Sequence, residues 1–103
     1  MIDVSDQKSV QAAFEDVKGR LNGQALWALV NNAGVGLSTC NDEQMILQTN
    51  LYGVKYCTDA FLPLMSKGSK IVNVGSGVGP AFVGGVLAKE DKVLLTSPET
   101  TWE

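Results

Sequence analysis

Two short, almost wholly apolar runs limit the folds open to this chain more than any other feature of its sequence. Residues 25–30 read Ala-Leu-Trp-Ala-Leu-Val, and residues 70–74 read Lys-Ile-Val-Asn-Val. Runs of this kind are typical of parallel strands that are buried on both faces. The β-branched side chains of the second run also favour extended structure. We therefore predict two buried strands of one parallel sheet.

A helical pattern precedes the first run. Between residues 6 and 21, apolar side chains recur at helical spacing, at Val10, Ala13, Phe14, Val17 and Leu21. Ser5 is the predicted N-cap, with Asp6 in the first turn. Asn22-Gly23 is predicted to end the helix, because both residues tolerate the left-handed conformation that often follows a helix.

A second helical pattern separates the two apolar runs. It begins at Asp42 and is interrupted by Gly53 and Pro63. The proline ring clashes with the carbonyl four residues back, so we expect a kink or a shortened last turn at Pro63. Gly68 is predicted to stop this helix. The order helix, strand, helix, strand is a βαβ pattern whose first strand is cut off just before residues 2–4.

These elements predict an α/β chain with part of a doubly wound parallel sheet. Residues 1–103 should form a single partial domain, with no repeats and no interdomain linker. The sequence leaves residues 80–103 poorly determined, as a tail of glycine-rich loop and a solvated charge cluster at residues 89–92. Ser97-Pro98 then signals a helix start with few residues left to form it. We therefore expect a truncated form of a longer chain.

Composition and charge argue against several classes of partner. Eight basic residues are scattered among 11 acidic ones, giving a formal net charge of −3, so nucleic acid and anionic membrane surfaces are not expected partners. No secretory signal is indicated, which favours the cytoplasm, and the most apolar stretch, residues 78–88, is too short to span a bilayer. With no histidine and two cysteines, Cys40 and Cys57 are expected to be free thiols.

Three motifs in order resemble the short-chain dehydrogenase/reductase family over residues 2–79. They are Leu-Val-Asn-Asn-Ala-Gly at residues 29–34, Thr-Asn at residues 49–50 and Ile-Val-Asn-Val-Gly-Ser at residues 71–76. Each motif alone also fits ordinary strand ends, helix faces and turns. The resemblance implies that residues 1–103 form a single partial NAD(P)-binding domain with a partial Rossmann-type sheet. It also implies NADP or NAD as cofactor, and hydride transfer between nicotinamide and a small-molecule carbonyl or alcohol.

The resemblance also implies which residues lie next to the cofactor. The bend after the first strand must let the backbone approach closely, and its residues are Asn31, Asn32, Ala33 and Gly34. Asp3 and Val4 match the pair that meets the adenine ring. The alternative for Asp3 is an exposed carboxylate that is favourable near a helix N-terminus.

Two residues are implied to be catalytic. Asn50 lies mid-helix, where asparagine is a poor helix former, and in the family this residue opens the helix locally to hold a water in a proton relay. Ser76 would hydrogen-bond the substrate carbonyl oxygen as negative charge grows on it. Their alternatives are a polar residue on an exposed helix face and a plain turn serine.

Two parts of the family pattern are absent from these residues, the glycine-rich phosphate loop and the Tyr-x-x-x-Lys pair. Tyr52-Gly-Val-Lys55 is one residue too short and precedes the serine strand, so Tyr52 and Tyr56 are predicted to be packing residues. The glycines of residues 75–79 match a dinucleotide loop only weakly, and Pro80 opposes an immediate long helix. The long gap after Ser76 is most similar to the carbonyl-reductase-like subgroup, interrupted within its insertion.

The sequence therefore favours an incomplete NAD(P)-dependent carbonyl or alcohol oxidoreductase. We expect these 103 residues to be inactive alone, because the phosphate loop and the proton donor are both lacking. The alternative is a non-catalytic chain, a truncated or degenerate nucleotide-binding or interaction module. Such a module would self-associate through exposed sheet edges, which are ready pairing surfaces.

Overall fold

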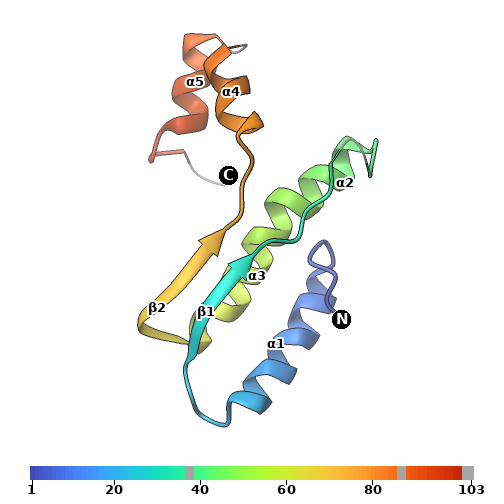
Figure 1. Ribbon diagram of the computed structural model, residues 1–103, viewed down its shortest axis with the longest axis vertical. Coiled ribbons are helices and arrows are strands. Elements are labelled where there is room, and N and C mark those ends of the chain that lie inside the picture. The colour runs from blue at the N-terminus through green and yellow to red at the C-terminus, as the bar shows by residue number, and fades with distance from the viewer. Residues whose placement is uncertain (37–38, 86–87, 101–103) are drawn as a thin grey trace.

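A computed structural model describes residues 1–36, 39–85 and 88–100. The predicted order of helix, strand, helix and strand is confirmed (Figure 1). The elements are α1 (Gln7–Leu21), β1 (Leu26–Asn31), α2 (Glu43–Leu47), the π-helix η1 (Gln48–Tyr52), α3 (Gly53–Phe61), the 3₁₀ helix η2 (Leu62–Leu64), β2 (Met65–Asn73), α4 (Val78–Gly85) and α5 (Lys89–Thr96). β1 and β2 pair in parallel, with Ala28 opposite Lys70 and Asn31 opposite Asn73.

The N-cap of α1 differs from the predicted one. Asp6, not Ser5, caps the helix, and its side chain accepts a hydrogen bond from the Lys8 N–H at 2.9 Å. The Ser5 hydroxyl instead donates to Asp3 Oδ1 at 2.7 Å. At the other end, Asn22 has a φ of 47°, so the predicted left-handed stop is confirmed.

The second helical segment ends earlier than predicted. At Pro63 the chain tightens into η2, as expected, and Met65 is already extended with a ψ of 154°. Gly68 therefore does not stop the helix, because it lies inside β2, where its φ of 96° accompanies an irregularity in strand pairing. Gly53 does not interrupt the helix either, since its backbone angles are helical.

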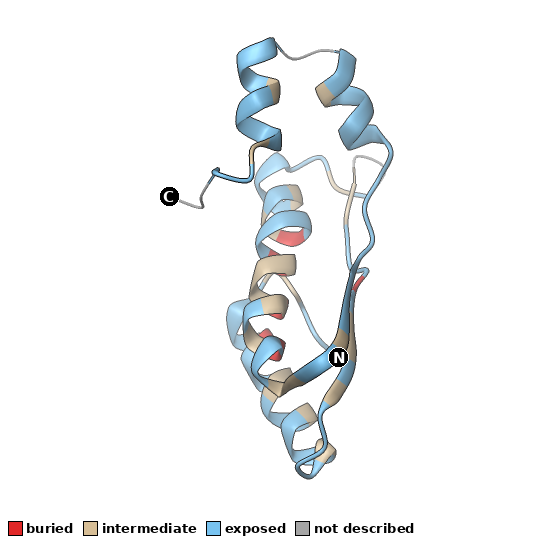
Figure 2. Ribbon diagram, turned by 90° about the vertical axis from the view of Figure 1, so that its left-hand side faces the viewer, coloured by how far each residue is buried: buried red, intermediate tan, exposed pale blue. Residues whose placement is uncertain are grey.

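The core lies between the helices and one face of the sheet. It contains Val10 from α1 with Cys57 and Phe61 from α3, and the Phe14 ring packs edge-on against Phe61 at 6.1 Å. The expected burial of both sheet faces is wrong. The helices α1, α2 and α3 lie on one side of the strands (Figure 2), and Trp27 stays 74% exposed.

After β2 the chain forms two helices where loop was expected. Pro80 occupies the first turn of α4, where its missing N–H breaks no helical hydrogen bond. Lys92 of α5 donates to the Gly84 carbonyl at 2.8 Å, which joins the two helices. Ser97 ends α5, and residues 98–99 form a turn where the sequence predicted the start of a helix. The remainder of that predicted helix, residues 101–103, lies outside the described part. No helix in the described part of the chain is long and apolar enough to cross a membrane.

Candidate functional site

The two strands end side by side, and their ends are joined through one buried amide. Asn31 closes β1 and Asn73 closes β2 in register. The Asn31 side-chain Nδ2 donates to Asn73 Oδ1 at 2.8 Å and to the Thr58 hydroxyl of α3 at 3.2 Å. Asn31 is 9% exposed, so these bonds hold the strand ends and the helix as one unit. Neither Asn73 nor Thr58 was a predicted site residue, although Asn73 is a polar residue between the apolar Val72 and Val74.

The loop after β1 is fixed to the second helical segment by Asn50. Its Oδ1 accepts from the Val35 N–H at 2.9 Å, and its Nδ2 donates to the Val35 carbonyl at 2.7 Å. The helix is wound as a π-helix over Gln48–Tyr52, which is the local opening expected around this residue. A Cβ on Gly34 would lie 3.3 Å from Asn50 Oδ1, so the loop passes close to the amide.

Replacing Asn50 with alanine should release this loop. Both hydrogen bonds to Val35 would be lost, and each typical bond contributes about 0.5–1.5 kcal/mol. We expect the Val35 amide proton to exchange with solvent roughly five- to tenfold faster if one such bond controls local opening. Hydrogen exchange followed by NMR measures this directly. Glu43→Ala is the control, since Glu43 lies in the first turn of α2. An unchanged exchange rate of the Val35 amide in Asn50→Ala would show that Asn50 does not hold this loop.

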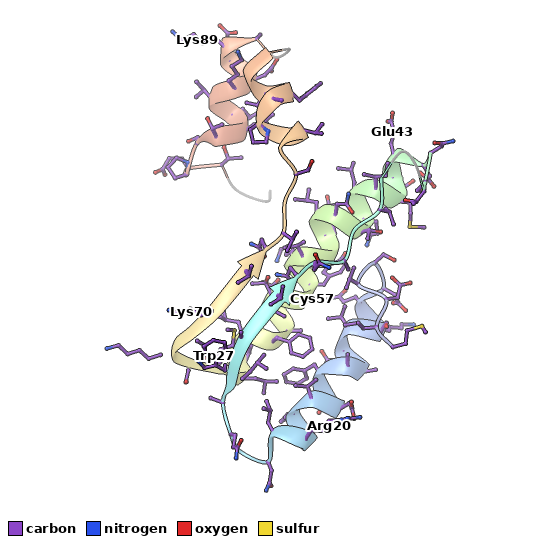
Figure 3. All side chains as sticks on the ribbon, viewed as in Figure 1. Arg20, Trp27, Glu43, Cys57, Lys70 and Lys89 are labelled. Carbon is purple, nitrogen blue, oxygen red and sulfur yellow. The ribbon has the colours of Figure 1, made fainter. Side chains whose placement is uncertain are left out.

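A pocket of about 230 Å³ opens beside the carboxyl end of β1. Its walls come from Ile2 and Val4 of the N-terminal segment, from residues 29–33, and from α3 at Gly53, Val54, Cys57 and Phe61. The structure thus gathers Val4, Asn31, Asn32 and Ala33 around one largely apolar cavity. Cys57 lies on α3 next to β1 (Figure 3), where burial raises the pKa of its thiol.

Asp3 has a local role at the margin of this pocket. Its Oδ1 accepts from the Ser5 hydroxyl at 2.7 Å and from the Ser5 N–H at 2.9 Å. These bonds, the hydroxyl first, hold the pKa of the Asp3 carboxyl below its usual value. The carboxylate is exposed, so one of its oxygens is open to further donors.

Ser76 and the tyrosines stand apart from the pocket walls. Ser76 follows β2, and its Oγ accepts from the Val78 N–H at 3.2 Å as α4 begins, which fits the turn alternative. The rings of Tyr52 and Tyr56 stack with their centroids 6.3 Å apart, and the Gln48 amide donates to the Tyr56 hydroxyl at 3.4 Å. Both tyrosines therefore pack on the helical segment, as predicted.

This arrangement offers an apolar cavity rimmed by backbone and asparagine groups. Val4, Cys57 and Phe61 can cover the face of a flat ring, and the amides of the bend after β1 can hydrogen-bond to sugar or ring substituents. The cavity is large enough for one ring system of a dinucleotide and not for the whole molecule. The residues present therefore fit part of a nucleotide cofactor.

Comparisons with known proteins match this chain to one family. A family profile described as short chain dehydrogenase matches residues 1–88. Human short-chain dehydrogenase/reductase family 9C member 7 is 36% identical over 94 residues, which are 82% of this chain and 30% of that protein. Human retinol dehydrogenase 16 is 40% identical over 86 residues, 76% of this chain and 27% of that protein.

A solved structure has the same arrangement of elements. An NADPH-bound carbonyl reductase from chicken fatty liver has a TM-score of 0.63 and 28% identity, and the match covers 76% of this chain and 37% of that one. The chain therefore spans well under half of the length of the proteins it matches.

Proposed function

This chain belongs to the short chain dehydrogenase family, and we propose that it forms part of the NAD(P)-binding domain of an oxidoreductase that interconverts carbonyl and alcohol groups. The names of its relatives, a retinol dehydrogenase and a carbonyl reductase, support this reaction class. The carbonyl-reductase-like subgroup and a cytoplasmic location are parts of the same proposal. The observation that carries it is the pocket at the carboxyl end of β1, the edge at which parallel sheets bind nucleotides.

The residues around the pocket divide into binding and positioning roles. Val4 and Ala33 would contact a ring of the cofactor, and Asp3, held by Ser5, would accept a hydrogen bond from an amino group on it. Asn50 keeps the loop after Gly34 close to the helix, so that its backbone stays available to the sugar. When bound, NADP or NAD would supply the hydride donor or acceptor.

Ser76 is proposed to polarise the substrate carbonyl. It follows the carboxyl end of β2, which lies beside the end of β1 (Figure 1). Its Oγ accepts a hydrogen bond from Val78, so its own proton is available to donate to a carbonyl oxygen. This donation would stabilise the negative charge that develops on that oxygen during reduction. The proton donor must come from outside these residues, so we expect no turnover from this chain alone.

An NADPH titration followed by NMR tests the binding part of the proposal. We expect shifts of the backbone amides of Val4, Asn32 and Ala33 on addition of NADPH, and comparison with NADH gives the cofactor preference. Ala33→Phe should fill the pocket and abolish the shifts. The same substitution at the exposed Ala12 should leave them unchanged. Shifts that persist in the Ala33→Phe variant would refute a cofactor site in this pocket. The absence of shifts with the original chain would refute it as well.

The second candidate is a non-catalytic interaction module, and the uncovered sheet favours it. Val30 is 57% exposed, and Val74 is 58% exposed. Apolar strands left open to solvent are contact surfaces rather than catalytic features. Turnover of an aldehyde or quinone with NADPH would exclude the interaction module. NADPH binding without turnover would agree with both candidate functions.

A further inference from the structure

The chain exposes far more surface than a folded monomer of its size. A protein of 11.0 kDa is expected to expose about 5,600 Å², whereas this one exposes 7937 Å². The excess of about 2,300 Å² is well above the roughly 800 Å² that each partner contributes to a standard interface. A large part of this surface is thus available for association.

The outer edge of β2 is the more accessible of the two sheet edges. In the described residues the sheet has the order β1-β2, so each strand has one unpaired edge. α1 lies on the β1 side and packs against α3, whereas none of the described helices lies beyond β2 (Figure 1). Helices of a second copy docked at β1 would collide with α1, and those of a copy docked at β2 would not.

Backbone direction shows which groups of β2 are open. The Val74 N–H donates to the Asn31 carbonyl at 2.9 Å, so Val74 directs its backbone groups toward β1. Successive residues of a strand direct theirs to alternate edges, so Ile71 and Asn73 direct theirs outward. The left-handed Gly68 accompanies an irregularity at the start of β2, which confines regular pairing to residues 70–74.

A second apolar stripe, on the helical segment between β1 and β2, is exposed to solvent. Leu47, Leu51 and Leu62 are 54%, 43% and 53% exposed, and their spacing along the segment places them on one face of it. The core uses a different stripe of the same segment, formed by Thr49, Gly53, Cys57 and Phe61. The surplus stripe, defined as Leu47, Leu51 and Leu62, is not buried by any of the described residues.

We propose that a second copy of this chain docks on both features at once. The two β2 strands pair antiparallel about a two-fold axis at Val72, with Ile71 of each copy opposite Asn73 of the other. In this arrangement the α3 helices of the two copies are separated by about two strand spacings, or about 10 Å. This is a distance at which helices pack against each other. The surplus stripes then face each other beneath a four-stranded sheet. This association is independent of cofactor binding.

The proposed register avoids like charges. Lys70 of each copy lies opposite the apolar Val74 of its partner rather than opposite another lysine. Val72, which is 46% exposed, meets its own copy at the axis. A closed two-fold contact leaves no β2 edge free, and α1 obstructs docking at the β1 edges, so assembly stops at the dimer.

Analytical ultracentrifugation of the purified chain over a range of concentrations tests the proposal. We expect a dimer, and Val72→Lys, which brings two charges together at the axis, should weaken it at least tenfold. Leu51→Lys alters the surplus stripe at an exposed position and serves as the second variant, with circular dichroism to verify folding. Val93→Lys, on the exposed face of α5, is the control and should dimerise normally.

Three outcomes would overturn the proposal. The first is a monomer at all concentrations, which would mean that the outer edge of β2 pairs with a segment outside these residues and not with a second copy. The second is growth into larger oligomers, because a closed two-fold pair does not grow. The third is a dimer that tolerates Val72→Lys and Leu51→Lys as well as it tolerates Val93→Lys.

Discussion

Replacing Phe61 with alanine is expected to lower the free energy of unfolding by about 3–5 kcal/mol. Phe61 is 7% exposed and forms the core with Val10 and Cys57, and its ring packs edge-on against Phe14. Removing the ring loses the free energy gained by burying it and leaves a cavity that the neighbouring helices cannot fill completely. Small domains have only about 5–15 kcal/mol of stability in total, so the variant should lose a large share of it.

Urea unfolding followed by circular dichroism measures this change, at a fixed protein concentration. Phe82→Ala is the matched control, because Phe82 of α4 is 51% exposed and loses little buried surface on truncation. The control should stay within about 1 kcal/mol of the original chain. Equal losses in the two variants would mean that Phe61 does not anchor the core.

The order of elements was predictable because local patterns determine it. The stripe from Val10 to Leu21 repeats at 3.6 residues, whereas residues 25–30 form a short apolar run, and the two patterns cannot be exchanged. The parallel pairing of the two runs followed from the helix between them, since parallel strands need a crossover. These features required no knowledge of distant contacts.

The predictions from sequence were wrong where distant contacts or competing hydrogen-bond partners determine the structure. Ser5 and Asp6 are both good N-caps, and the choice fell to Asp6 because the Ser5 hydroxyl is used by Asp3. The glycines around α4 predicted loop, yet Pro80 falls in the first turn of a helix, where it is tolerated. The expectation of strands buried on both faces assumed a second layer, which the described residues do not provide.

The candidate site was predictable in its motifs but not in its contacts. The sequence indicated Asn31 and Asn50, but it could not show that Asn31 bonds to Thr58 and Asn73, or that Asn50 holds Val35. These partners lie 15 to 42 residues away along the chain, so only the packed fold defines them. The roles assigned to Ser76 and Asp3 stay predictions.

Gly53→Ala is expected to destabilise the chain by about 1–3 kcal/mol, although alanine is the better helix former. Gly53 has helical backbone angles, so it is not required for an unusual conformation. It is required for space, because a Cβ there would lie 2.9 Å from Val4 Cγ2 and 3.0 Å from the Val4 carbonyl oxygen. A backbone oxygen and a stiff β-branched side chain cannot move aside cheaply.

Gly19→Ala is the matched control, with the opposite expected sign. Gly19 is also within a helix, but a Cβ there would have nothing within 4 Å. Alanine should therefore stabilise α1 by about 0.5–1 kcal/mol through its lower backbone entropy when unfolded. Because Val4 and Gly53 both line the pocket, Gly53→Ala should in addition weaken the NADPH-induced shifts, whereas Gly19→Ala should not. Equal gains in stability from the two substitutions would show that α3 does not approach Val4 this closely.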